Sequence, residues 1–173
     1  PEAKELAGMI DTYKELGPTL KSKELQKRPV FFGIPFDGRT RISPIYPLTS
    51  LILISAGQPI ILQGGSTMPV KYGATTNELF KVLGLNLENL TIYQVQNCFH
   101  TNDFAFVYQP DHFSLADKLI SFREEIGKRP PIASLELIWC AHEGEHLHIS
   151  GFVHSPTEKR HWKALELVGE KEL

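Results

Sequence analysis

The chain has 173 residues, of which 42% are hydrophobic and 22% charged, a composition typical of one soluble domain with its own core. It excludes a disordered chain, a collagen and a coiled coil. Lys and Arg number 18 against 20 Asp and Glu, so the formal net charge is -2 at pH 7. A chain with so little net charge does not attract nucleic acid or an anionic membrane as a whole.

The cysteines and the hydropathy pattern indicate the cytoplasm. Cys98 and Cys140 lie far apart in the sequence and form no CxxC pair, which argues against a disulfide scaffold or a cysteine-ligated zinc. The most apolar stretch, residues 48–56, is too short to span a bilayer, and the chain opens on charged residues rather than a signal peptide. We therefore expect a cytoplasmic protein without membrane contacts.

The first part of the chain predicts a helix, a strand and a second helix. Apolar residues recur at helical spacing over residues 2–16, and Gly17 with the following proline ends that helix. The apolar run 30–34 predicts a buried strand. Ser43 precedes a proline, a combination typical of an N-cap and first helical residue, and the helix it predicts closes at Gly57.

The middle of the chain continues this alternation. Residues 59–62 predict a strand that runs directly into the small-residue loop 64–67. Residues 75–78 and 91–94 each match a capping box, which predicts two further helices, the first ending at Gly84.

The last part predicts two strands and two helices. Residues 104–108 and 147–153 have the pattern of strands, and the spacing in 132–141 also allows a strand. Pro156 begins a last helix. Ser114 begins another helix, whose predicted apolar face carries Leu115, Leu119, Phe122 and Ile126.

Strands that alternate with helices predict an α/β fold with a mainly parallel sheet and helices on both faces. The strands that begin just after Pro29, Gln58, Asn102 and His146 should lie in one sheet. In such sheets, ligands bind at the loops that leave the carboxyl ends of the strands.

The loop over residues 33–43 is the first candidate for chemistry. It combines glycines, two arginines and a predicted helix start, which together favour an anion such as phosphate. A surface loop with solvated arginines is the alternative. The loop 64–67 adds small residues and hydroxyls that a phosphate or a ribose can approach, although turns use the same residues for conformational reasons. We expect the two loops to converge on one cleft that binds a phosphate-bearing ligand.

The segment from His142 to His146 matches the HExxH pattern of zinc proteases, which requires both histidines on one helical face. Gly144 and the strand-like residues that follow disfavour a helix. The third histidine of the extended pattern is absent, which leaves Glu166 as a formal candidate ligand. We therefore predict that this segment holds no catalytic zinc.

The order of these motifs resembles the phosphoribosyl-binding α/β domain of the anthranilate phosphoribosyltransferase family, from residue 30 to the end of the chain. The family's Gly-Thr-Gly-Gly-Asp loop falls on residues 33–37, its Asn-Ile-Ser-Thr helix start on 41–44, and its Lys-His-Gly-Asn loop on 62–65. Its Lys-Ser-Gly falls on 71–73, and its Gly-Val-Tyr-Ser-Pro turn on 151–156. The agreement is in spacing more than in identity, and it favours a short helix within 132–141.

The resemblance implies displacement at the anomeric carbon of phosphoribosyl pyrophosphate by an aromatic amine such as anthranilate, a step of tryptophan biosynthesis, with Mg²⁺ on the leaving pyrophosphate. His112 and Arg123 would face the acceptor, Arg123 at the position of the family's arginine that holds the aromatic acid, and Ser43 would also contact the metal. The alternatives are a capping or buried histidine and a solvated arginine. The remaining substrate-binding residues would be Gly33, Asp37, Gly38, Arg39, Arg41, Ser43, Gly64, Gly65, Ser66, Thr67 and Lys71.

The resemblance also predicts how the chain is organised. Residues 1–28 would be part of a helical region with its linker, and residues 29–173 an α/β domain that is incomplete at its carboxyl end. We expect both ends of a longer protein to be missing, with the family's acidic metal ligands beyond Leu173, and the full-length protein to be a homodimer.

The departures from the family pattern leave two other function classes open. Pro35 and Phe36 replace two flexible glycines of the first loop, which predicts weak binding and slow or absent transfer. A member that binds a nucleotide or nucleic acid without catalysis is the first alternative, although the net charge argues against nucleic acid. A zinc hydrolase built on the two histidines is the second.

Overall fold

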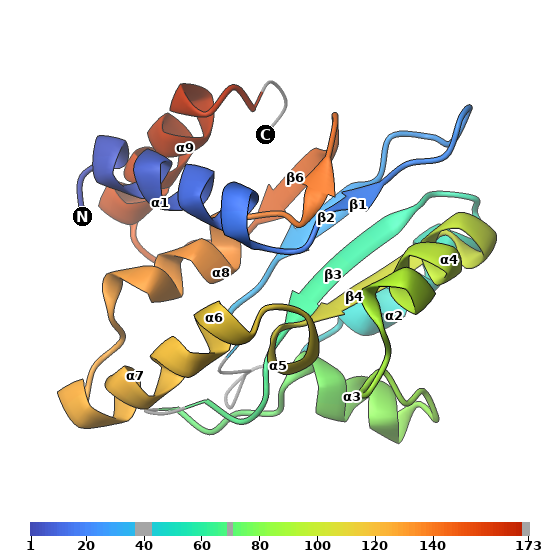
Figure 1. Cartoon of the computed structure of the whole chain (residues 1–173), viewed down its shortest axis with the longest axis horizontal. Helices are drawn as coiled ribbons and strands as arrows, with labels where there is room; N and C mark the ends of the chain where they lie inside the picture. The colour runs from blue at the N-terminus through green and yellow to red at the C-terminus, as the bar shows by residue number, and fades with distance from the viewer. Residues whose placement is uncertain (37–42, 69–70, 171–173) are drawn as a thin grey trace.

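A four-stranded parallel sheet forms the centre of the molecule (Figure 1). The computed structural model describes residues 1–36, 43–68 and 71–170. The spatial order of the strands is β4-β3-β2-β6, and all neighbours are parallel. Their bounds are β2 Val30–Gly33, β3 Ile60–Gly64, β4 Phe104–Tyr108 and β6 Leu147–Ser150. The prediction of one parallel sheet from these four segments is confirmed.

The strands are apolar on both sides because both faces of the sheet are covered. All five residues of β3 and all five of β4 are buried. In the register, Val30 lies beside Ile60 on one side and Leu147 on the other, and Ile60 lies beside Phe104. Continuous apolar strands of this kind are expected in a buried parallel sheet.

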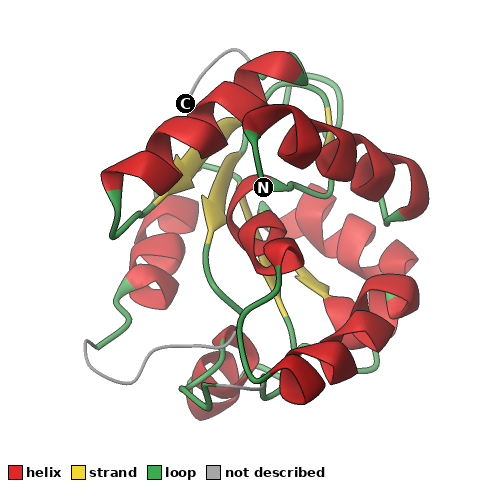
Figure 2. Cartoon of the chain, turned by 90° about the vertical axis from the view of Figure 1, so that its left-hand side faces the viewer, coloured by secondary structure: helices red, strands yellow, loops and turns green. Residues whose placement is uncertain are grey.

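Helices cover both faces of the sheet, as the sequence predicts (Figures 1 and 2). A second, small parallel sheet joins β1 Leu20–Lys21 to β5 His142–Glu143, and two 3₁₀ turns span Lys118–Ile120 and Pro131–Ser134. The α-helices are α1 Ala3–Leu16, α2 Tyr46–Ser55, α3 Thr76–Val82, α4 Ile92–Asn102, α5 Gln109–His112, α6 Ser114–Asp117, α7 Ser121–Ile126, α8 Leu135–Ile138 and α9 Ser155–Leu167.

Two hydrophobic clusters fill the space between the sheet and its helices. On one face, Phe31 and Ile61 pack in a cluster with residues of α1, α4, α8 and α9. On the other face, Ile60 and Leu62 pack with Phe80 of α3 and with partly buried residues of α2. Successive strand residues point to opposite faces, which explains why neighbours in sequence belong to different clusters.

The helix boundaries follow the local capping signals in several places. The side chains of Thr75 and Thr91 both accept a hydrogen bond from the backbone N–H three residues on, which confirms the two predicted capping boxes. Gly84 has φ of +85°, as expected for a helix-ending glycine. The segment 132–141 contains a 3₁₀ turn followed by α8, so the short helix favoured by the resemblance is correct.

Two predicted helices differ from the structure. The helix predicted from Ser43 begins at Tyr46 instead, and Pro47, not Pro44, lies in its first turn. The helix predicted from Ser114 is divided into α6, a 3₁₀ turn and α7. Its predicted apolar face points outward, with Leu115 55%, Phe122 49% and Ile126 56% exposed, while Ala116 and Arg123 on the opposite side are buried.

Among these helices, none combines the length and the apolar composition required to cross a membrane, within the residues that the structure describes.

Candidate functional site

The carboxyl ends of β2 and β3 lie side by side, which brings the beginnings of the two loops singled out in the sequence, residues 34–36 and 65–67, to one edge of the sheet. The loops also touch, because a Cβ atom on Gly65 would lie 3.3 Å from the Phe36 ring. Ser43, Ser66, Thr67 and Lys71 are exposed. Asp37, Gly38, Arg39 and Arg41 lie outside the described residues.

Close packing explains one of the glycines at this edge. A Cβ atom on Gly33 would lie 2.0 Å from the backbone carbonyl oxygen of Leu137, which is too short for any side chain. A Cβ atom on Gly65 would lie 2.0 Å from the Met68 methyl carbon, but this methyl is the end of a flexible side chain that can move aside. Gly33 is therefore required by neighbouring protein atoms, whether or not a ligand also approaches it.

His112, expected to face an acceptor, uses both ring nitrogens within the fold. Its Nδ1 accepts a hydrogen bond from the Tyr108 N–H at 3.0 Å. Its Nε2 lies 2.8 Å from the Leu90 carbonyl oxygen and donates to it. The ring therefore holds the start of α5 against the segment that precedes α4, which is the capping role named above as the alternative.

Arg123, the other residue expected to face an acceptor, is almost completely buried and forms an ion pair within the chain. Its side chain is 2% exposed, and Nη1 donates to Oε1 of Glu136, which is 8% exposed. The other oxygen, Oε2, accepts a hydrogen bond from the Phe36 N–H at 2.8 Å. The carboxylate thus connects α7, α8 and the loop after β2.

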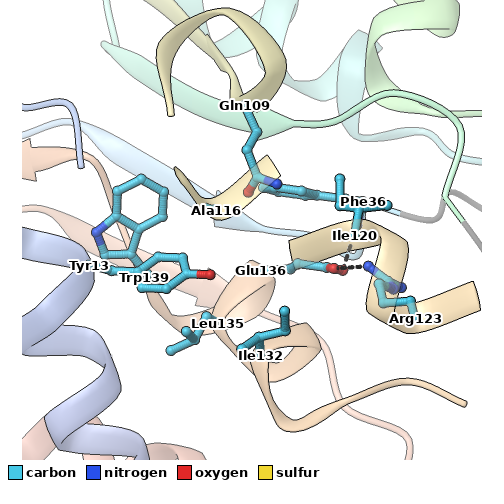
Figure 3. A pocket seen from close by; sticks show the side chains of 10 residues that line it. All are labelled: Tyr13, Phe36, Gln109, Ala116, Ile120, Arg123, Ile132, Leu135, Glu136 and Trp139. Atoms are coloured by element: carbon cyan, nitrogen blue, oxygen red, sulfur yellow. Dashed lines mark hydrogen bonds and ion pairs between the residues drawn. The ribbon is translucent and has the colours of Figure 1, made fainter. Parts of the chain in front are cut away.

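A small cavity surrounds this pair near the carboxyl edge of the sheet (Figure 3). Its volume is about 20 Å³, enough for roughly one water molecule. Burial, and secondarily the negative charge of Glu136, raises the pKa of Tyr13 to about 12, so the phenol stays neutral. The lining residues are Tyr13, Phe36, Gln109, Ala116, Ile120, Arg123, Ile132, Leu135, Glu136 and Trp139.

Of the residues that line this cavity, the sequence indicated only Arg123 as a site residue, and it did not reveal the hydrogen bonds that Glu136 forms with Arg123 and Phe36. The signal for Glu136 was present, because it is the one charged residue in the otherwise uncharged run 130–141. A charge inside a buried element needs a partner. That rule predicts a cation opposite Glu136, although it does not say which one.

The segment His142–His146 lies at the opposite, amino-terminal edge of the sheet. His142 belongs to β5, and Gly144 has φ of +107°, so the segment is not helical, as predicted. The two imidazole rings nevertheless approach to 5.7 Å between centroids. Burial above all lowers the pKa of His142 to about 4, and burial also lowers the pKa of His146.

The described part of the chain contains no group of three or more His, Cys, Asp or Glu side chains arranged to hold a metal ion. Around His146, the Glu170 carboxylate lies 3.7 Å from Nε2 and forms an ion pair with Lys14 at 2.9 Å.

Comparison with known proteins gives a consistent result, although no protein-family model matches the chain. An anthranilate phosphoribosyltransferase of Pseudomonas putida is 26% identical over 125 residues, which cover 72% of this chain and 35% of that protein. The enzyme of Hydrogenovibrio crunogenus is 32% identical over 81 residues, covering 47% of this chain and 23% of that protein.

Solved structures extend the similarity to nearly the whole fold. The anthranilate phosphoribosyltransferase of Thermus thermophilus matches 98% of this chain with a TM-score of 0.80 at 18% identity. The resemblance to the anthranilate phosphoribosyltransferases is confirmed. The Saccharomyces cerevisiae enzyme, solved in complex with PRPP and Mg, matches 96% with a TM-score of 0.69 at 15% identity.

The match to the anthranilate phosphoribosyltransferases is partial on their side. The chain spans 35% of the length of the Pseudomonas putida relative and about half of each structural neighbour, 50% and 45%. The shared part is the α/β fold with its parallel sheet and the N-terminal helix α1.

Proposed function

We propose that the chain binds phosphoribosyl pyrophosphate at the carboxyl edge of its sheet and acts as a phosphoribosyltransferase-like protein. The observation that carries this proposal is the adjacency of β2 and β3, whose following loops touch through Phe36 and Gly65. Parallel α/β sheets bind ligands at this edge. The similarity to a fold that has been solved with PRPP and Mg supports the choice of ligand.

The proposed reaction is displacement at the anomeric carbon, in which an aromatic amine such as anthranilate forms the new C–N bond and pyrophosphate leaves. No protein nucleophile is required, so the chain would position the substrates and neutralise the leaving group. The residues proposed to bind phosphoribosyl pyrophosphate are Gly33, Asp37, Gly38, Arg39, Arg41, Ser43, Gly64, Gly65, Ser66, Thr67 and Lys71.

Mg²⁺ would supply electrostatic stabilisation of the departing pyrophosphate. Ser43 is exposed and lies in the segment that leads to α2. Magnesium in phosphate-binding sites is commonly held by one or two carboxylates together with water and the substrate's phosphates. That arrangement fits the lack of a metal-binding side-chain cluster among residues 1–36, 43–68 and 71–170.

Binding without transfer is the second candidate, and one observation favours it. The two side chains proposed for the acceptor are engaged within the chain, Arg123 by Glu136 and His112 by two backbone groups. The homodimer, the cytoplasmic location and the division into residues 1–28 and 29–173 stay predictions.

Calorimetry with phosphoribosyl pyrophosphate and Mg²⁺ tests the proposal. Lys71→Ala should weaken binding, and Lys27→Ala is the matched control, because Lys27 is also exposed but precedes β2 at the opposite edge. Arg39→Ala and Arg41→Ala should each cost about 1.5 to 3 kcal/mol of binding free energy if they hold phosphates.

The absence of binding heat at millimolar ligand would reject the proposal. If Lys27→Ala weakens binding as much as Lys71→Ala does, the ligand binds somewhere other than the proposed edge. A transfer assay with anthranilate and with aniline, an aromatic amine that lacks the carboxylate, then separates the two candidates, since only the first predicts release of pyrophosphate with either amine.

A further inference from the structure

Glu136 is bound in the way that a free carboxylate ligand would be. One oxygen receives the guanidinium of Arg123 and the other receives the Phe36 N–H, at 2.8 Å. Charged donors and backbone N–H groups together are the usual partners of a bound carboxylate. The donors come from α7 and from the loop after β2, whereas the carboxylate comes from α8.

The surroundings of this carboxylate are aromatic and already filled. Figure 3 shows Glu136 directed at Arg123, with Tyr13 and Trp139 on one side and Phe36 above. The rings of Tyr13 and Trp139 meet edge to face, with 5.3 Å between their centroids. With about 20 Å³ remaining, the cavity has no space for a second carboxylate or an aromatic ring.

We infer that Glu136 is an intramolecular carboxylate ligand, which fills the acceptor end of the site and excludes acceptors that carry a carboxylate, anthranilate included. The acceptor of the proposed reaction is thereby narrowed to an aromatic amine without a carboxylate. Arg123 is the cation to which such an acceptor would bind, and because Glu136 belongs to the same chain, its binding to Arg123 is an intramolecular step with which a free acid has to compete. That the excluded carboxylates are acceptors rests on the proposed function. That Arg123 is occupied by the Glu136 carboxylate does not.

Glu136 is therefore a specificity-determining residue of this chain. Its removal has a predictable geometric result, because Glu136→Ala deletes one methylene and the carboxylate, the equivalent of acetate. The variant should bind small carboxylates at the position left by the side chain. Formate and acetate match the vacated space, whereas benzoate does not, because Tyr13, Phe36 and Trp139 still occupy the remainder.

The test is thermal unfolding of Glu136→Ala in sodium acetate, formate, benzoate and chloride at equal ionic strength. We expect acetate and formate to raise the midpoint by several degrees over chloride, and benzoate to leave it unchanged. Glu136→Gln, which keeps the space filled, is the matched control and should not respond. The double variant Arg123→Met/Glu136→Ala should lose the response, because it lacks the cation.

The wild-type chain supplies an independent measurement. Ligand-observed NMR should detect no binding of anthranilate at millimolar concentration to the wild type. Arg123-dependent binding of anthranilate to the wild type would overturn the inference, as would a folded Glu136→Ala variant that is indifferent to acetate.

The remaining outcome concerns folding. If Glu136→Ala is insoluble in chloride, purification in acetate should recover it, and insolubility in both salts would also count against the inference. Failure of the proposed function has a different signature, namely no binding of phosphoribosyl pyrophosphate while the acetate response of Glu136→Ala persists.

Discussion

Two regions of the molecule bury ionisable side chains, and they do so in opposite ways. At the carboxyl edge of the sheet, Arg123 and Glu136 are buried as a charged pair with a backbone N–H on the second carboxylate oxygen. In β5 and β6, His142 and His148 are buried as neutral rings, because burial lowers the pKa of each to about 4. The first region depends on keeping its two charges together, and the second depends on the absence of charge.

Separating the charged pair should have the largest effect on stability. Arg123→Met leaves the Glu136 carboxylate buried without its cation, and the loss of one partner of a buried pair typically costs about 3 to 5 kcal/mol of unfolding free energy. Urea denaturation at pH 7 measures this loss. Arg160→Met on the exposed side of α9 is the control, and an equal effect of the two substitutions would contradict the prediction.

Acid should weaken the histidine region next. His148 has a pKa of about 4 in the folded state, caused first by burial, against 6.5 for an unperturbed side chain. The unfolded state therefore binds a proton at a higher pH than the folded state does. Stability is fully present above pH 6.5 and falls as the pH drops from 6.5 to about 4, by as much as about 3 kcal/mol for this residue.

His148→Gln sharpens this test, because an amide can still donate to the Leu137 carbonyl oxygen that the Nε2–H reaches at 2.7 Å. The variant should show a shallower loss of unfolding free energy between pH 6.5 and 4. His154→Gln, at an exposed histidine, is the control. A pH profile that His148→Gln leaves unchanged would show that His148 does not carry the effect.

Separating an exposed ion pair should have the smallest effect on the unfolding free energy, in contrast to the buried pair of Arg123 and Glu136. Lys163 and Glu166 on α9 lie 2.8 Å apart, but their side chains are 62% and 56% exposed. Lys163→Ala should change the unfolding free energy by less than about 0.5 kcal/mol, because water solvates both charges. A loss comparable to that of Arg123→Met would mean that burial is not what distinguishes the two pairs.

Much of the fold was predictable because its signals are local. The four strands are short apolar runs. Thr75 and Thr91 mark the starts of their helices, because each side chain accepts a hydrogen bond from a backbone N–H within the first turn. The error at residues 114–126 shows the limit of periodicity. Ala116 and Ile120 form a second apolar row beside Arg123, and the helical spacing alone does not decide which row faces the core.

The candidate site was less predictable, because its decisive contact joins residues that no motif connects. The sequence singled out the loops 33–43 and 64–67, and the proposal that they bind a phosphate-bearing ligand stays a prediction. It also singled out Arg123, but a buried arginine and a solvated one look alike in a sequence. The pairing with Glu136 depends on how α7 and α8 approach each other in three dimensions.

The contact of α1 with α9 has a consequence for the order of folding. Leu6 and Ile10 of α1 belong to the same cluster as Ala164 and Leu165 of α9, and Lys14 pairs with Glu170 across 156 positions of sequence. Closing so long a loop costs chain entropy before any contact forms. Because α1 is synthesised before α9, it cannot meet this native partner until residues 17–154 have been made, and amide hydrogen exchange should show both helices opening as one cooperative unit.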